Sequence, residues 1–234
     1  LGQKTEGAPP ANALALAAFL ARQGKITEAL DLCEKYASKL PPPQLALALV
    51  SVVQTGKPTR IELDRVEKKL KSLQSGASKD FALLFAEANL MHTLQRPAQS
   101  ETIYRELLQM DANNAVVLNN LAWLISEQPE SLGEAQQLIN KAIELAGPEG
   151  ALLDTRGMIF LRASKLNEAV NDLKLAVEKE PTPLHWLHLA YAQHQNKNTA
   201  DAATAWNLAK KLSEGELSTD DKRQYAVLKL SYGN

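Results

Sequence analysis

The chain has 234 residues, of which 45% are hydrophobic and 23% are charged, and this balance excludes an intrinsically disordered chain. Aromatic residues account for only 5%, so a core must be built mainly from Ala and Leu, the best helix formers. A formal net charge of −1 excludes a strong positive field, and we therefore expect no nucleic-acid partner. The one cysteine, Cys33, excludes an intrachain disulfide and a Cys-rich zinc site.

The first expected helix contains the longest apolar stretch of the chain, nine residues from Ala13 to Ala21. A bilayer requires about 20 such residues, so we expect no membrane insertion. Behind Lys4 the stretch could imitate the apolar part of a secretory signal, but we interpret it as a structural helix because a repeat begins there. The chain starts at Leu1 rather than Met, which leaves open whether it is a segment of a longer protein, and the sequence does not identify a compartment.

Small residues recur at intervals of about 34 residues, which predicts an internal repeat. One set of small residues follows an acidic residue: Ala29, Ala135, Ala169 and Ala202. A second set lies upstream of the first: Ala17, Ser51, Ala88, Ala122, Gly157 and Ala190. We therefore predict six repeats, over residues 10–43, 44–80, 81–114, 115–149, 150–182 and 183–216. A polar leader (1–9) precedes them, and a capping helix with a short tail (217–234) follows.

Each repeat has the pattern of two amphipathic helices. In the fifth repeat, the apolar residues from Leu152 to Leu161 form one stripe and those from Ala169 to Val177 form a second. The turn between them ends at Asn167, which we expect to cap the second helix. A single hairpin cannot bury both of its apolar faces, so neighbouring hairpins must stack. No linker interrupts the series, and we therefore predict one domain.

The sixth repeat carries the clearest set of large and small positions. They are Trp186, Leu189 and Ala190 in its first helix, and Ala202, Trp206 and Ala209 in its second. This pattern resembles the tetratricopeptide repeat, and the segment LNNLAWL over residues 118–124 is similar to bacterial members of that family. The resemblance implies an all-α fold, a right-handed α-solenoid of about six helix-turn-helix repeats plus a C-terminal capping helix. It also implies a scaffold for protein–protein interaction.

The capping helix has its own start signal. Ser218 lies three residues before Asp221, the spacing at which the two side chains can bond each other's backbone amides. We expect Tyr225, Leu228 and Leu230 to cover the open end of the sixth repeat, because solenoids need terminal caps.

No catalytic motif accompanies the repeats. The sequence has neither a nucleophile elbow nor a glycine loop for phosphate or dinucleotide binding. His185 and His188 are too few to hold zinc alone, and we interpret the histidines as surface or groove residues. Cys33 occupies a place that needs an apolar residue, so we expect a packed, unreactive thiol. The mixed-charge run from Lys57 to Lys79 is typical of an exposed helix. We therefore expect no enzyme activity, cofactor or metal.

In the family that the chain resembles, the first helix of each hairpin lines an inner groove where a peptide or helix binds. From the third repeat onward this face carries polar and aromatic residues: Asn89, His92, Asn119, Asn120, Trp123, Asp154, Met158, His188, Tyr191 and His194. Asn side chains can pair with a peptide backbone, and Trp123 and Tyr191 can supply flat anchors. Trp123 could instead fill space between hairpins, and Trp186 and Trp206 are assigned to the core. We predict a protein or peptide partner at this face.

The same face is almost wholly aliphatic in the first two repeats, where its members include Leu14, Ala18, Leu45, Leu49 and Val52. Such a face needs a cover, which could be a partner, a second copy of the chain or an upstream segment. This favours an alternative function in assembly, with a possible homo-oligomer. A further alternative is an accessory segment of a longer enzyme.

Some members of the family bind the C-terminal carboxylate of chaperones through paired Lys, Asn and Arg side chains. Asn89 and Asn120 fit the two Asn positions. Phe85, Ala151 and Thr155 stand where the cations should be, so the charge-assisted bonds to a carboxylate are absent. The sequence therefore argues against binding of a chaperone tail.

Overall fold

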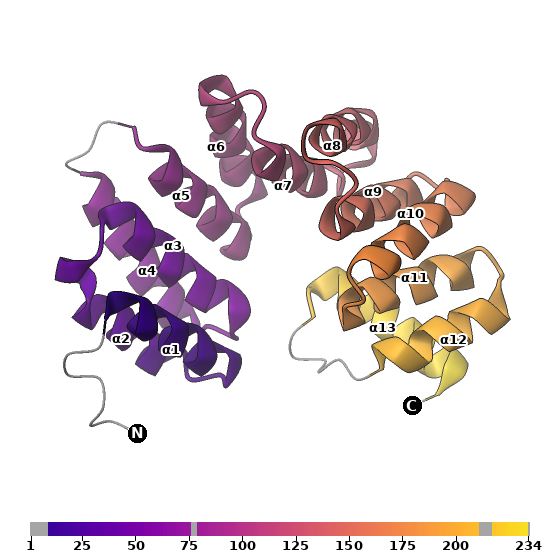
Figure 1. Cartoon of the computed structure of the whole chain (residues 1–234), viewed down its shortest axis with the longest axis horizontal. Coiled ribbons are helices and arrows are strands. Elements are labelled where there is room, and N and C mark those ends of the chain that lie inside the picture. Colours follow the sequence, from indigo (N-terminus) through magenta and orange to yellow (C-terminus); the bar gives the residue numbers. More distant parts are fainter. Residues whose placement is uncertain (1–8, 76–78, 211–216, 234) are drawn as a thin grey trace. The chain divides into compact units, whose positions relative to one another are not determined.

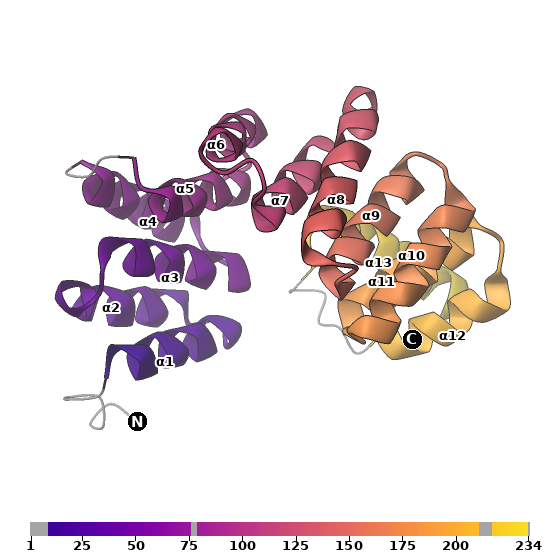
Figure 2. The ribbon, with the colours of Figure 1, turned by 45° about the horizontal axis from the view of Figure 1, so that its top comes forward.

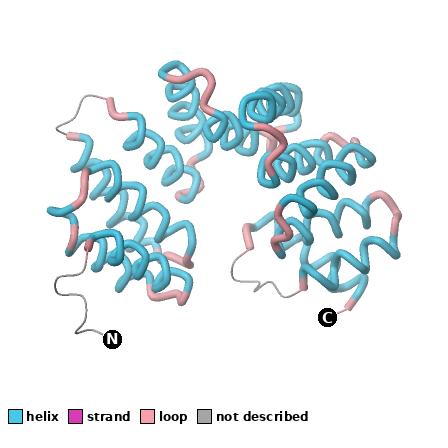
Figure 3. Tube along the Cα trace, in the orientation of Figure 1, coloured by secondary structure: helices cyan, strands magenta, loops and turns pink. Residues whose placement is uncertain are grey.

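The computed structural model describes residues 9–75, 79–210 and 217–233, so most of the predicted leader and the end of the sixth repeat lie outside the described residues. In the described ranges the chain forms α-helices and two short 3-10 turns, and no strand (Figures 1 and 3). The α-helices are α1 (Pro10–Arg22), α2 (Ile26–Lys35), α3 (Pro42–Thr55), α4 (Arg60–Gln74), α5 (Phe81–Thr93), α6 (Pro97–Met110), α7 (Ala115–Ile125), α8 (Leu132–Ala146), α9 (Gly150–Arg162), α10 (Leu166–Lys179), α11 (Pro183–Gln195), α12 (Thr199–Ala209) and α13 (Thr219–Tyr232). The prediction of an all-α fold with six hairpins and a further helix is confirmed.

The packing divides the chain into two compact units, unit 1 (Leu1–Met110) and unit 2 (Asp111–Asn234). The division falls between the third and fourth predicted repeats, where the sequence shows no linker. The repeat signature describes contacts inside a hairpin and with its neighbour, so it carries no signal for this division.

Unit 1 contains the hairpins α1/α2, α3/α4 and α5/α6, and its first helices contact one another in chain order (Figure 2). Its core is continuous from α1 to α5 and is aliphatic, with Leu30, Leu49 and Leu90 fully buried. α4 begins at a capping box, in which the Thr59 hydroxyl accepts from the Glu62 amide and the Glu62 carboxylate accepts from the Thr59 amide. The hairpins are thus fixed by apolar burial together with local capping.

The charged helix α4 has the exposed polar face that its sequence predicts. Ion pairs join it to the neighbouring hairpins: Arg65 binds Asp31 and Glu34 of α2 at 2.7 and 2.8 Å. Glu67 binds Arg96, which follows α5, at 3.0 Å. The mixed charges therefore act within the chain.

Unit 2 contains the hairpins α7/α8, α9/α10 and α11/α12, followed by α13. A Cβ on Gly157 would lie 2.6 Å from Leu173 Cγ, so α9 and α10 approach closely only because residue 157 has no side chain. This explains the small residue that recurs at this place in the repeat. α10 begins at Leu166, so the expected cap at Asn167 is wrong. Asn167 lies inside α10, and its amide oxygen accepts from Asn196 at 3.1 Å.

The capping helix α13 begins at the predicted signal. The Ser218 hydroxyl accepts from the Asp221 amide, and the Asp221 carboxylate accepts from the Ser218 amide. Tyr225 and Leu228 are buried against Trp206 and its neighbours, as expected. Leu230 is 90% exposed, so its expected place in the cap is wrong. In a helix, residues 228 and 230 lie on different faces, and only the face of Leu228 meets the core.

Candidate interaction surface

The first helices of unit 2, α7, α9 and α11, contact one another in series, and α11 in turn contacts α13. α7 carries three of the candidate groove residues, Asn119, Asn120 and Trp123, all of them partly exposed. The Asn119 amide donates to the Asn120 side-chain oxygen at 3.3 Å. The Asn119 oxygen is buried and has no hydrogen-bond partner among the described residues. This part of α7 therefore combines an aromatic face with amide groups, as the sequence predicts.

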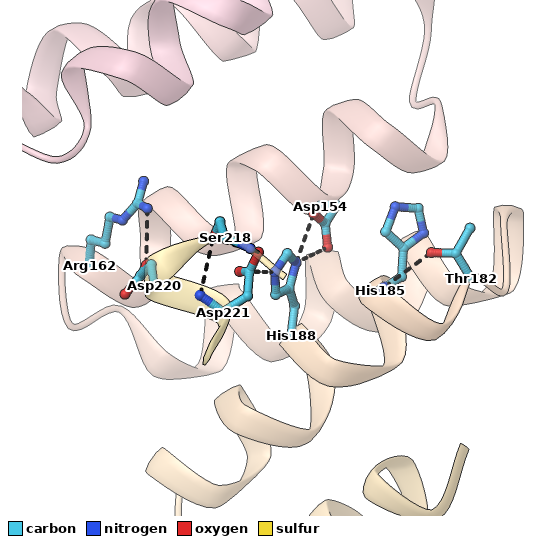
Figure 4. Close-up of polar contacts among 8 residues, drawn as sticks. All are labelled: Asp154, Arg162, Thr182, His185, His188, Ser218, Asp220 and Asp221. Carbon is cyan, nitrogen blue, oxygen red and sulfur yellow. Dashed lines mark hydrogen bonds and ion pairs between the residues drawn. The ribbon is translucent and has the colours of Figure 1, made fainter. Parts of the chain in front are cut away.

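A buried polar chain crosses the C-terminal half of unit 2 and is drawn in Figure 4. His188 of α11 donates from Nδ1 to both carboxylate oxygens of Asp154 in α9, at 2.8 and 2.9 Å. It donates from Nε2 to Asp221 of α13 at 3.1 Å. Carboxylates only accept hydrogen bonds, so both ring nitrogens must carry protons and the imidazole is positively charged. The interpretation of His188 as a surface or groove residue is therefore wrong, since only 2% of it is exposed.

The charges of this chain shift the protonation of its members. Burial alone would lower the pKa of His188, but the two carboxylates outweigh it and raise that pKa to about 10. Burial likewise opposes the charge of Asp221, but the hydrogen bonds from His188 and Ser218 hold the pKa of Asp221 below its usual value. α13 is therefore attached to unit 2 by an ionised pair.

Arg162, at the end of α9, joins three helices. Its guanidinium lies over the ring of Trp123 at 4.3 Å from the centroid and donates to the Ser126 hydroxyl just after α7. It also donates to Asp220 of α13 at 3.2 Å (Figure 4). The Ser126 hydroxyl in turn donates to the Trp123 carbonyl. Trp123 is thus partly exposed and covered on one face by a cation.

The remaining candidates of unit 2 divide between the interior and the surface. Met158 is 1% exposed and Asp154 is bonded inside the unit, so neither side chain lies open to a ligand. Tyr191 is partly exposed and packs on the core around Trp206. His194, also partly exposed, bonds the Tyr232 hydroxyl of α13 at 3.0 Å.

Unit 1 holds the candidates Asn89 and His92, both partly exposed on α5. Asn89 is engaged within the unit: its amide donates to the Phe85 carbonyl at 2.9 Å, and its oxygen accepts from the Tyr104 hydroxyl at 3.0 Å. A ligand would have to compete with these bonds.

The aliphatic candidates of unit 1 behave in two ways. Leu45 and Leu49 are core residues, at most 1% exposed. Leu14, Ala18 and Val52 instead line a pocket of about 380 Å³ between α1 and α3. The other lining residues are Ala17, Cys33, Gln44, Leu47, Ala48 and Ser51. Part of the predicted apolar face is therefore an open hollow, and part of it is core.

The thiol and the remaining histidine of the sequence analysis both lie in the interior. Cys33 is free and buried, as predicted, and burial raises its pKa to about 11. His185 is buried, and its Nδ1 contacts the Glu180 carbonyl at 2.7 Å. Among the described residues, no group of three or more His, Cys, Asp and Glu side chains is arranged to hold a metal ion. In the same ranges, every helix is too short or too polar to cross a bilayer.

The sequence analysis missed Arg162, Asp220 and Asp221 as partners of the first helices. One signal was available, because Asp154, His188 and Asp221 are spaced by 34 and 33 residues. This spacing is the repeat length, so the three residues occupy equivalent places in successive hairpins. Opposite charges at equivalent places predict contact between neighbours. Arg162 and Asp220 are 58 residues apart and gave no such signal.

Comparison with known proteins places this architecture. A family described as tetratricopeptide repeat matches residues 155–215. A TPR repeat-containing protein of Pseudomonas aeruginosa is 28% identical over 165 residues, which cover 69% of this chain and 27% of that protein. The chain thus spans about a quarter of the length of this curated relative.

Two solved structures share the fold. A thermophilic TPR protein of Thermus thermophilus is 17% identical, with a TM-score of 0.66 over 80% of this chain and 99% of its own. A chain of the APC/C hetero-tetramer Cut9–Hcn1 is 16% identical, with a TM-score of 0.69 over 92% of this chain and 42% of its own.

Proposed function

Since this chain is a tetratricopeptide-repeat protein, with the role in protein–protein interaction that its fold indicates, we propose that it is a non-catalytic scaffold whose unit 2 binds a peptide or protein segment along its first helices. The site consists of Asn119, Asn120 and Trp123 on α7 together with Tyr191 and His194 on α11, which we call the unit 2 surface. The observation that carries the proposal is the state of Trp123, a large aromatic ring left partly exposed in a helix layer that otherwise buries its apolar residues.

The chemistry of the unit 2 surface suits a polypeptide ligand. Asn side chains offer a donor and an acceptor, the pair that a peptide backbone presents in return. Trp and Tyr are the residues that most often dominate binding energy at protein interfaces. The surface is carried by helices with a packed core beneath them, so binding would order little of the receptor.

The proposal is tested by selection from a random dodecapeptide library against the full chain. We expect peptides selected on the wild type to lose at least tenfold in affinity for Trp123→Ala, since buried aromatic anchors are worth about 2 kcal/mol. Leu208→Ala is the matched control, because Leu208 is 45% exposed on the second helix α12. Equal affinities for wild type, Trp123→Ala and Tyr191→Ala would overturn the assignment, provided that urea unfolding shows all three folded.

A second candidate function, assembly through unit 1, is favoured by the pocket between α1 and α3. Phe19 on α1 is 52% exposed and Leu47 on α3 is 37% exposed, so apolar area continues onto these helices beyond the pocket. A charge at Leu14 or Leu47 would abolish docking there, whereas a charge at Leu49 would unfold the core. Sedimentation velocity of the wild type and Leu14→Glu over a concentration series decides: identical monomers would exclude self-association.

A further inference from the structure

Two arginines of α9 bind carboxylates, and the two pairs differ in geometry and in exposure. Arg156 forms two hydrogen bonds with Asp172 of α10, at 2.6 and 2.9 Å, and Asp172 is only 6% exposed. Arg162 binds Asp220 through one contact of 3.2 Å, and the Asp220 side chain is 42% exposed. The first pair is closed to solvent and structural. The second presents a carboxylate that water already reaches.

Arg162 is held in place independently of Asp220. The Trp123 ring supports one face of the guanidinium, and the Ser126 hydroxyl accepts from a different nitrogen, Nη1, than the one that faces Asp220, Nη2. Only 17% of the Arg162 side chain is exposed. A planar, immobilised and largely desolvated guanidinium is well suited to bind a carboxylate, because little side-chain freedom remains to be lost.

α13, in turn, is held in place independently of Asp220. Asp221 caps the helix and bonds His188, and Leu228 is completely buried. At the other end of the helix, the Trp206 indole donates to the Gly233 carbonyl at 2.7 Å. The Asp220 carboxylate can therefore leave Arg162 while α13 stays attached. An exposed ion pair of this kind contributes little stability, so its exchange is cheap.

We propose that Arg162, supported by Trp123 and Ser126, is a binding site for a carboxylate on an acidic segment of the partner protein, and that Asp220 occupies this site as an internal competitor. The inference rests on the proposed function, because the same Trp123 belongs to the unit 2 surface. It adds the chemistry of the ligand: an Asp or Glu side chain placed beside the residue that contacts Trp123. It also adds a mechanism, in which the partner displaces one carboxylate without undocking α13.

The test measures binding of a fluorescein-labelled decapeptide of alternating Glu and Ala to the full chain by fluorescence anisotropy. The counterpart peptide carries Gln in place of Glu. We expect the wild type to prefer the Glu peptide, and Asp220→Asn to bind it about fivefold more tightly, the gain expected when a weak internal ion pair no longer competes. Arg162→Gln should bind both peptides equally. The preference for the Glu peptide should fall as salt is added.

Matched controls are available on other helices. Asp201→Asn removes an acid from the first turn of α12, as Asp220→Asn does for α13. Arg22→Gln removes an arginine from the last turn of α1, as Arg162→Gln does for α9. Neither control should change the affinity for the Glu peptide. If Arg162→Gln fails to fold by circular dichroism, the Asp220→Asn variant decides the question.

The opposite results separate this inference from the function on which it rests. Unchanged or weaker binding of the Glu peptide by Asp220→Asn would overturn it, because Asp220 would then be only a tether for α13. Equal binding of Glu and Gln peptides by the wild type would overturn it as well. Library peptides that bind through Trp123 but lack acidic residues would leave the proposed function standing and remove only the carboxylate site.

Discussion

The buried histidine of unit 2 makes the stability of the C-terminal half dependent on alkaline pH. His188 faces Asp154 from α9 and Asp221 from α13, and these carboxylates raise its pKa from 6.5 to about 10 in the folded chain. A raised pKa means that the folded state holds the proton more tightly than the unfolded state. The added stability is therefore complete below pH 6.5 and is lost as the pH rises through about 10.

The size of this effect follows from the interval between the two pKa values. At about 1.4 kcal/mol per pH unit, the interval from 6.5 to about 10 corresponds to roughly 5 kcal/mol. Between pH 7 and pH 9 the free energy of unfolding should fall by about 2–3 kcal/mol. On the acid side, the lowered pKa of Asp221 means that stability is lost only as the pH falls below 3.8.

The assay is urea unfolding followed by tryptophan fluorescence at pH 7 and pH 9. Trp206 reports on α13 directly, because its ring lies 4.8 Å from that of Tyr225. His188→Gln supplies the comparison: it leaves two buried carboxylates without a cation, so we expect a loss of about 3–5 kcal/mol at pH 7 and no further loss at pH 9. Equal stability of the wild type at the two pH values, or the same slope in His188→Gln, would refute the reasoning.

Three further predictions concern packing, capping and reactivity. Gly157→Ala should lower the free energy of unfolding by about 1–2 kcal/mol in urea, because the new Cβ would lie 2.6 Å from Leu173 Cγ and the gain in helix propensity does not offset that overlap. Thr59→Ala should cost about 1 kcal/mol in the same assay through the loss of the capping box with Glu62, with circular dichroism showing the helix content nearly unchanged. Cys33, whose pKa is raised to about 11, should react with a disulfide reagent at pH 8 about a hundredfold more slowly in the folded chain than in urea; equal rates would contradict its burial.

The hairpins could be predicted because their determinants are local. Gly157 recurs as a small residue wherever a first helix must approach its second helix, and Ser218 and Asp221 mark a helix start by their spacing alone. Such features depend on neighbours a few residues away or on one repeat. They therefore leave a periodic trace in the sequence.

The polar contacts between helices could be predicted only in part. His188 was assigned to the surface because histidine is polar, and its burial depends on two carboxylates from other helices. Arg162 meets Asp220 because of the direction in which α13 runs across unit 2, which no repeat position specifies. Leu230 failed for the same reason, since one turn of α13 decides which apolar residues face the core.

The alternation of acid, base and acid along α9, α11 and α13 constrains how unit 2 could change during evolution. Each member meets a partner of opposite sign because a single hairpin separates the two acids. Excising the α11/α12 hairpin would bring Asp154 opposite Asp221 with no imidazole between them, and two like charges would be sealed in the interior. Duplicating that hairpin would set two histidines side by side. The copy number of hairpins at this end of the chain is therefore locked by charge parity, whereas a purely aliphatic stack could gain or lose a member freely.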